Sequence, residues 1–172
     1  RDDGIKAEIA DVEPEFFTTT FANYEIIADE NEKVFVFENH INHNIKTDRT
    51  LLKQLMTILF DNAVKYTEEG RVIKFIVWSK DRSLYLRVSD NGPGINNEDK
   101  KKIFDRFYRV DKARTRQKGG FGLGLSLAKQ IADALKGTIT VKDNRPKGTI
   151  FEVKISIKSE SKKKPTKLIG NK

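Results

Sequence analysis

The chain has 172 residues, of which 37% are hydrophobic and 34% charged, and its long apolar-periodic segments indicate one folded domain with one core rather than a disordered chain. The absence of cysteine excludes a disulfide scaffold and a cysteine-ligated zinc site. No apolar run reaches the roughly 18 residues that predict a membrane span, no signal-peptide pattern opens the chain, and the abrupt start RDDGIK suggests a part of a longer protein.

The net charge of +8 is concentrated at the end of the chain. Residues 158–172 contain six lysines and one glutamate, so five of the eight net charges belong to this segment and three to the rest. The lysine- and serine-rich composition predicts a disordered tail over residues 158–172. A contact of this tail with acidic lipid or RNA is the alternative.

The first half of the chain predicts strands and helices in alternation. Strands are expected where apolar residues alternate, and helices where they recur every three to four residues. These patterns predict strands at 5–12, 33–39, 71–79 and 84–90 and helices at 16–31 and 49–66. Thr47 and Asp48 are expected to cap the second helix, and the last two strands to form a hairpin-like pair.

The second half contains fewer regular segments. Residues 91–94 form a glycine-proline turn, residues 97–110 a short helix, and residues 110–121 a mobile loop without apolar periodicity. An amphipathic helix over 123–137 stops at Gly137. Strands at 138–144 and 149–157 close a hairpin. The order of these elements favours an α/β sandwich, with one mixed sheet and helices on one face.

One polar side chain interrupts the apolar side of the helix at 49–66. On a helical wheel the apolar arc contains Leu51, Leu52, Leu55, Ile58 and Leu59. Asn62 lies inside this arc, with Tyr66 one turn further along, Lys65 at its edge and Asp61 pointing well away. A buried amide without a partner costs about 1–3 kcal/mol. Asn62 is therefore either a satisfied core residue or a group that faces a cavity.

The stretch DNGPGI directly follows a predicted strand. An ionised Asp90 at the strand end can accept a hydrogen bond from an exocyclic amine. Gly92 and Gly94 would remove side chains where a flat ring approaches the backbone. An ordinary turn at the end of a strand is the alternative.

The stretch GGFGLGLSLAK places Gly120, Gly122 and Gly124 ahead of a helix. Backbone amides at a helix N-terminus bind phosphate when no side chain intervenes. The spacing fits neither a dinucleotide-binding fold nor a Walker loop. Four arginines and a lysine precede these glycines, namely Arg106, Arg109, Lys112, Arg114 and Arg116. They form either a solvated face or bidentate phosphate contacts.

Taken in order, these stretches resemble the motifs of sensor histidine kinases. LLKQLMTILFDNAVKYT resembles the N box, DNGPGI the first glycine box, IFDRFYR the F box, GGFGLGLSLAKQI the second glycine box and KGTIFEV the closing strand. The resemblance covers residues 5–157. It implies a Bergerat ATP-binding fold, with residues 1–157 as the catalytic, ATP-binding domain.

The resemblance implies a role for each matching position near the phosphates. Asn62 would ligate the Mg²⁺ ion that bridges the ATP phosphates, Lys65 would neutralise phosphate charge, and Tyr66 would line the nucleotide. Arg109 and Arg114 would reach the outer phosphates. With Asn62 and Lys65, these two arginines make up the implied catalytic set.

The resemblance also implies an adenine slot and an ATP lid. Asp90 would accept a hydrogen bond from the adenine amine. The floor of the slot would be Gly92, Gly94 and Ile95. Residues 110–121 would form the lid, and the phosphates would be wrapped by Gly120, Gly122, Leu123, Gly124 and Leu125.

Two features depart from the relatives of this fold. Related ATPases carry a glutamate one turn before the metal asparagine, where it activates water, and kinases often carry a second asparagine there. This chain has Ile58, which cannot accept a proton, so an ATPase motor is disfavoured. The phosphoacceptor histidine of the family also has no match, because His40 and His43 read as turn residues.

The expected function is therefore transfer of the ATP γ-phosphoryl group to a histidine on a dimerisation domain outside this chain. The expected partners are that domain and a response regulator. The full-length protein is expected to be a membrane-anchored homodimer with this domain in the cytoplasm, and this chain alone a monomer. An ATP-binding regulatory module without kinase activity is the alternative. A nucleic-acid-binding domain is disfavoured because aromatic residues do not interleave with the lysines.

Overall fold

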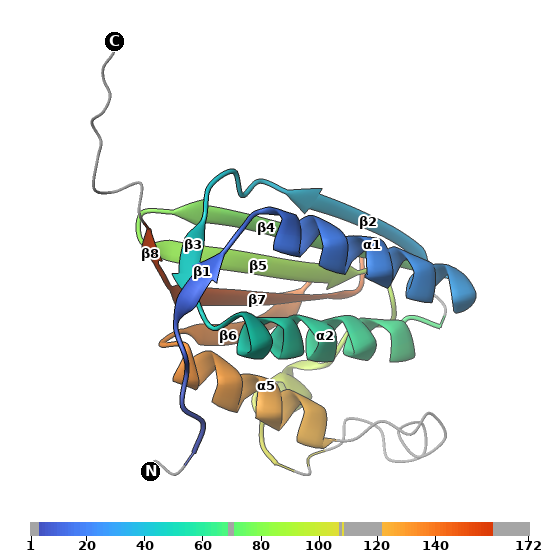
Figure 1. The fold of residues 1–172 in the computed structure, drawn as a ribbon. Coiled ribbons are helices and arrows are strands. Elements are labelled where there is room, and N and C mark those ends of the chain that lie inside the picture. The colour runs from blue at the N-terminus through green and yellow to red at the C-terminus, as the bar shows by residue number, and fades with distance from the viewer. Residues whose placement is uncertain (1–3, 69–70, 107, 109–121, 160–172) are drawn as a thin grey trace.

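A mixed five-stranded sheet forms the centre of the computed structural model, which describes residues 4–68, 71–106, 108 and 122–159. The strand order across the sheet is β2 (Val34–Asn39), β4 (Val72–Lys80), β5 (Ser83–Asp90), β7 (Thr149–Ser156) and β6 (Thr138–Asp143). β2 and β4 are parallel, and the other neighbours are antiparallel. Helices α1 (Glu15–Glu30), α2 (Arg49–Lys65) and α5 (Gly122–Ala134) cover one face (Figure 1). The predicted α/β sandwich and both hairpins are confirmed.

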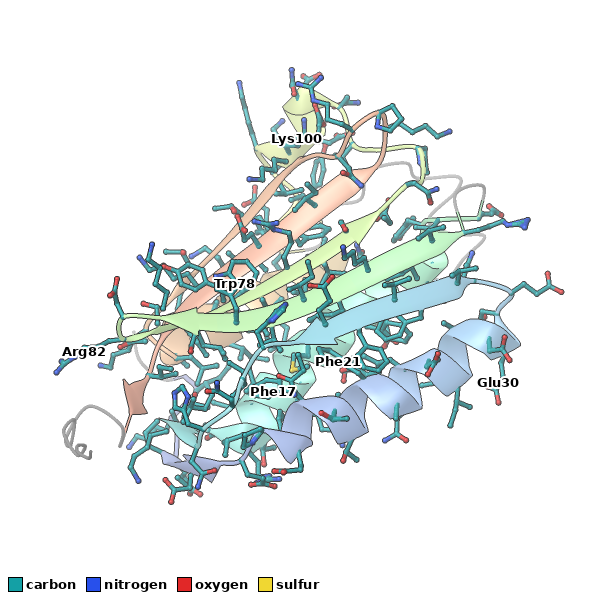
Figure 2. All side chains as sticks on the ribbon, turned by 90° about the horizontal axis from the view of Figure 1, so that it is seen from above. Phe17, Phe21, Glu30, Trp78, Arg82 and Lys100 are labelled. Carbon is teal, nitrogen blue, oxygen red and sulfur yellow. The ribbon has the colours of Figure 1, made fainter. Side chains whose placement is uncertain are left out.

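The alternation of side chains along the strands gives the sheet one buried face. In β5, Leu84, Leu86 and Val88 are buried while the residues between them are half-buried, as the period of two requires. Figure 2 shows Phe17 and Phe21 of α1 between that helix and the sheet. The burial of these apolar side chains is the main source of stability of the domain.

Helix α2 is fixed at its start and along its length. The Asp48 Oδ1 atom accepts the Leu51 N–H at 2.9 Å, which confirms Asp48 as the predicted cap. Thr47, the other predicted capping residue, does not cap the helix, because its buried hydroxyl has no hydrogen-bond partner among the described residues. The other oxygen, Oδ2, accepts the Glu8 N–H at 2.7 Å. Further along, the Tyr24 ring of α1 stacks on Phe60 with ring centres 4.3 Å apart. The helix is thus held by both the N-terminal segment and α1.

A second, three-stranded sheet was not predicted. It consists of β1 (Ala10–Val12), β3 (Ile45–Thr47) and β8 (Lys158–Ser159). The predicted strand at 5–12 is shortened to three residues, because β3 offers only three partners. The tail expected from 158 begins instead with β8, which pairs with β3. Residues 160–172 of the predicted tail lie outside the described ranges.

The helix predicted over 97–110 is mostly wrong. Among the described residues of this stretch, only α3 (Asn97–Lys100) is α-helical, and residues 101–106 continue as turns. Residues 107, 109 and 110 of the predicted helix lie outside the described ranges. Asn96 caps α3 by accepting the Asp99 N–H at 2.8 Å. Beyond it, Ile103 is buried and the Phe104 ring packs edge-on against Phe151 of β7. These contacts with the sheet set the path of the segment in place of helical periodicity.

Within the described ranges, no helix combines the length and apolarity that crossing a bilayer requires.

Candidate nucleotide site

A cavity of about 130 Å³ lies between the C-terminal half of α2 and the first turn of α5. Its lining consists of Ile58, Asp61, Asn62, Lys65, Tyr66, Gly124 and Leu125. The packing of α5 against α2 therefore joins the two motifs that the sequence analysis singled out, although about 60 residues separate them. Five of the predicted site residues line this one cavity.

Asn62 faces this cavity rather than the core. The residue is half-buried, and among the residues that the structure describes, its carboxamide has no hydrogen-bond partner. The sequence left two alternatives for Asn62, a core residue with its hydrogen bonds satisfied or a group that faces a cavity. The structure favours the second, because a core asparagine would bond to the protein interior. The carboxamide oxygen is available to a ligand in the cavity.

The neighbours of Asn62 give the cavity its polar edge. Lys65 is exposed and Tyr66 half-buried, and both line the cavity. Asp61 also lines it, so the expectation that this side chain points well away is wrong. The wheel considered α2 alone, whereas the start of α5 closes the cavity from the side. A carboxylate thus lies beside the carboxamide of Asn62.

Ile58 packs where relatives of this fold carry a polar group. A Cβ atom placed on Gly124 would lie 3.8 Å from the Ile58 Cγ2 atom, which is an ordinary van der Waals distance. The isoleucine therefore faces the start of α5 directly and presents a methyl group to the cavity. It supplies no acceptor for a proton at this point.

Asp90 lies at the end of β5 and is buried. Its Oδ1 atom accepts the Gly92 N–H at 2.9 Å and the Thr149 N–H at 3.3 Å. Burial raises the pKa of this carboxyl to about 6, although the two amide donors favour the charged form. Both donors bond to Oδ1, so Oδ2 can accept from a ligand, as the prediction for this residue requires.

The glycines after Asp90 have a structural reason that the sequence analysis did not give. A Cβ atom on Gly92 would lie 2.9 Å from the Tyr66 carbonyl oxygen and 3.2 Å from the Thr67 Cα atom. Gly92 therefore allows the loop after β5 to touch the end of α2. Gly94 has a φ of +85°, which glycine adopts without strain. Ile95 is half-buried against the core.

Several predicted site residues cannot be placed. Arg109, Arg114 and Gly120 lie outside the described residues. The whole of the predicted loop 110–121 lies outside them as well. Gly122 and Leu123 belong to the first turn of α5 by their backbone. Sequence reasoning missed Thr149 and Asn144, which contact Asp90. Thr149 belongs to the motif KGTIFEV, but its contact with Asp90 arises from the pairing of β7 with β5.

The family model described as histidine kinase-, DNA gyrase B-, and HSP90-like ATPase matches residues 47–159, which contain all of these residues. The chain belongs to this family. The matched region contains α2, β5 and α5. The cavity and Asp90 therefore lie within the domain that the family model describes. The resemblance to the ATP-binding domains of sensor histidine kinases is confirmed.

Relatives of this ATPase-family domain are sensor kinases. Sensor protein CiaH of Streptococcus pneumoniae is 75% identical over 164 residues, which are 95% of this chain and 37% of CiaH. The signal transduction histidine-protein kinase ArlS of Staphylococcus aureus is 43% identical over 112 residues, which are 65% of this chain and 25% of ArlS. The chain thus spans well under half of the length of these relatives.

Solved structures share the fold of this ATPase-family domain. The nucleotide-free catalytic domain of histidine kinase ThkA has a TM-score of 0.73 and 29% identity, covering 87% of this chain and 95% of that one. Full-length ShkA in complex with AMPPNP has a TM-score of 0.76 and 23% identity, covering 90% of this chain and 32% of that one. These structures confirm the predicted fold class.

Proposed function

We propose that this chain binds Mg²⁺–ATP and donates the γ-phosphoryl group to a histidine on the dimerisation domain of a two-component sensor kinase. The observation that carries the proposal is the Asn62 carboxamide, which faces the cavity between α2 and α5 without a partner among the described residues. The 75% identity to CiaH supports the kinase class. The fragment supplies the ATP-binding part, and the acceptor histidine belongs to another domain.

The donor set fits a magnesium ion that is bound largely through the nucleotide. Mg²⁺ prefers oxygen ligands and is held by one or two protein groups together with phosphate oxygens and water. Asn62 provides an amide oxygen. In the described ranges, no group of three or more histidine, cysteine, aspartate or glutamate residues could form a metal site without phosphate. When bound, the ion would offset charge on the transferred phosphoryl group.

The remaining residues would position the nucleotide. Lys65 at the rim would offset phosphate charge, and Tyr66 would contact the nucleotide between the cavity and Asp90. Oδ2 of Asp90 would accept from the adenine amine. Arg109 and Arg114 would bind the outer phosphates, and the backbone of Gly120 to Leu125 would surround them. Ile58 leaves the position one helical turn before Asn62 without a proton acceptor, which favours transfer over hydrolysis.

The proposed partners follow from the relatives. A structure of ThkA contains the response regulator TrrA, and it matches this chain with a TM-score of 0.71 and 26% identity over 92% of this chain and 44% of that one. We propose that a cognate response regulator receives the phosphoryl group here as well. The full-length protein would be a membrane-anchored homodimer with this domain in the cytoplasm.

Calorimetry with ATP, with and without Mg²⁺, tests the site. Wild-type protein should bind ATP more tightly when Mg²⁺ is present. Asn62→Ala should lose that gain, because the protein ligand of the ion is removed, while binding without Mg²⁺ changes little. Gln54→Ala is the matched control, since Gln54 is an exposed polar residue on α2 outside this cavity. An unchanged Mg²⁺ dependence in Asn62→Ala would contradict the assignment.

A further inference from the structure

The turn between β6 and β7 folds back onto the end of β5. Asn144 begins this turn, and its Nδ2 atom donates to the main-chain carbonyl oxygen of Asp90 at 2.8 Å. The two residues are 54 positions apart in the chain. Asn144 is half-buried, so the bond is shielded in part from competing water. A side chain from one hairpin thus holds the backbone of the residue that the proposed function assigns to the adenine amine.

The geometry of Asn144 itself is fixed by its own turn. Its backbone N–H donates to the Gly148 carbonyl oxygen at 3.0 Å, and its Oδ1 atom accepts the Arg145 N–H at 2.9 Å. The Oδ1 contact orients the carboxamide so that Nδ2 points to Asp90. The two ends of the carboxamide therefore have separate tasks, one within the turn and one across to β5.

The same turn touches Asp90 at a second place. Gly148 has a φ of +116°, and a Cβ atom placed on it would lie 1.9 Å from the Asp90 carbonyl oxygen. The next residue, Thr149, donates its N–H to the Asp90 carboxylate. The β6–β7 turn therefore contacts both the carbonyl and the carboxylate of Asp90. A change in the position of the turn would move the carboxylate.

We infer that Asn144 is a positioning residue for nucleobase selectivity, which acts by holding the Asp90 backbone through its Nδ2 atom. This inference rests on the proposed function, in which Asp90 reads the adenine amine. A hydrogen bond to an exocyclic amine depends strongly on distance and angle. Asn144 does not touch the base; it keeps the Oδ2 atom of Asp90 where the amine arrives.

The two tasks of the carboxamide allow a sharp test with Asn144→Asp. Aspartate keeps the shape and the acceptor for the Arg145 N–H, but it places an oxygen against the Asp90 carbonyl. We expect ATP affinity, measured by calorimetry at pH 8 with Mg²⁺, to fall about three- to tenfold, because a displaced Asp90 carboxylate makes a weaker hydrogen bond to the adenine amine. GTP affinity should not change, because guanine has no amine at that position.

Three further variants complete the test. Asn144→Ala should give a smaller ATP-selective loss, and Lys147→Ala, an exposed residue of the same turn, should give none. In an Asp90→Ala background, Asn144→Asp should have no additional effect on ATP affinity, since residues that act through one another are not additive. Thermal unfolding of each variant records whether the fold is intact.

Several outcomes would overturn the inference. An equal loss for ATP and GTP, an intact Asn144→Asp variant with unchanged selectivity, or a full additional loss in the Asp90→Ala background would each do so. If both Asn144 variants are unfolded at the assay temperature, the role of Asn144 is structural and the inference fails. Failure of the proposed function looks different, because wild-type protein would then show no preference for ATP over GTP.

Discussion

Asp90 serves two requirements that oppose each other. In its proposed role Asp90 would have to be ionised, so that its carboxylate accepts a hydrogen bond from the adenine amine. As a buried group it resists ionisation, and burial raises the pKa of its carboxyl to about 6. The bonds from the Gly92 and Thr149 amides offset part of this cost. In the free protein the charged form of Asp90 is therefore destabilised by burial and only partly compensated by these two amides.

Replacing this charge should stabilise the free domain and weaken ATP binding. The folded-state pKa lies above the ordinary value of 3.8, so the favourable effect of the protonated form is present below about pH 4 and is lost as the pH rises through 6. Asp90→Asn should raise the free energy of unfolding by about 1–3 kcal/mol at pH 7.5 and by little at pH 4. Urea denaturation at both pH values measures this.

The control for this prediction is Glu25→Gln, which neutralises an exposed carboxylate on α1 and should leave the unfolding free energy nearly unchanged at both pH values. The same Asp90→Asn protein should bind ATP more weakly at pH 7.5. The prediction is wrong if Asp90→Asn is no more stable than wild-type protein at pH 7.5. That result would show that burial does not destabilise the Asp90 carboxylate.

At this scale, the sequence predicts residues whose role depends on their own element. Asn62 could be singled out because a single amide in an apolar helical arc needs a partner, and Asp90 because it ends a strand before a glycine turn. Their roles toward a nucleotide stay predictions. Asp61 was placed wrongly because its environment depends on α5. Asn144 was missed because its bond joins two strand ends 54 residues apart, and no local pattern records that contact.

Among the elements, α2 provides most of the residues that line the cavity. Contacts with α1 hold this helix in place. The Tyr24 hydroxyl is hydrogen-bonded to the Thr57 Oγ1 atom at 2.6 Å. Tyr24 is buried, and burial raises the pKa of its hydroxyl, so this group stays protonated and able to donate. Thr57 is only half-buried. The two partners of one bond therefore differ in their access to water.

This difference predicts unequal effects of two conservative substitutions. Thr57→Val leaves the buried Tyr24 hydroxyl without a partner and should cost about 1–3 kcal/mol of unfolding free energy. Tyr24→Phe leaves a Thr57 hydroxyl that water can reach, and it should cost about 1 kcal/mol. The double variant should be no less stable than Thr57→Val alone. Urea denaturation measures all three, and equal costs for the two single variants would contradict the argument.

Elements were predicted well where their own periodicity is long. Helices α1, α2 and α5 and strands β4, β5 and β7 each follow an apolar period over eight residues or more. The strands β3 and β8 have three and two residues, which is too few to show alternation. β3 pairs with β1 and, more than 100 residues further along the chain, with β8. The existence of both short strands depends on this non-local pairing, so it could not be read from the sequence.

For the whole molecule, the sheet order explains how distant motifs form one site. The loop after β5 touches the end of α2 at Gly92, α5 packs on α2 at Gly124, and the β6–β7 turn contacts the end of β5 at Gly148. Each contact occurs where a side chain is absent. The order of the motifs predicted the family and the α/β class, whereas the register that creates these contacts is a property of the folded chain.

The arrangement of the molecule also predicts whether a histidine of this chain can accept the γ-phosphoryl group. The two histidines of the chain lie on the loop after β2, where His40 contacts Glu38 at 2.9 Å, and neither lines the cavity beside Asn62. With Mg²⁺ and radiolabelled ATP, this chain alone should gain no acid-labile phosphate. Addition of a dimerisation domain that carries the phosphoacceptor histidine should produce labelled acceptor, since the γ-phosphoryl group then has a nucleophile within reach.

Two variants locate the cause of that transfer. Asn62→Ala should reduce the rate of labelling by about two orders of magnitude or more, because charge on the phosphoryl group is no longer offset at the transition state. His40→Gln should leave it unchanged, since His40 is exposed and lies outside the cavity. Wild-type protein that binds ATP with its Mg²⁺ dependence intact, yet labels no acceptor, would instead indicate an ATP-binding module without kinase activity. Labelling that persists in Asn62→Ala would remove this residue from the reaction, because Asn62 is the protein ligand that the proposed mechanism assigns to the metal ion.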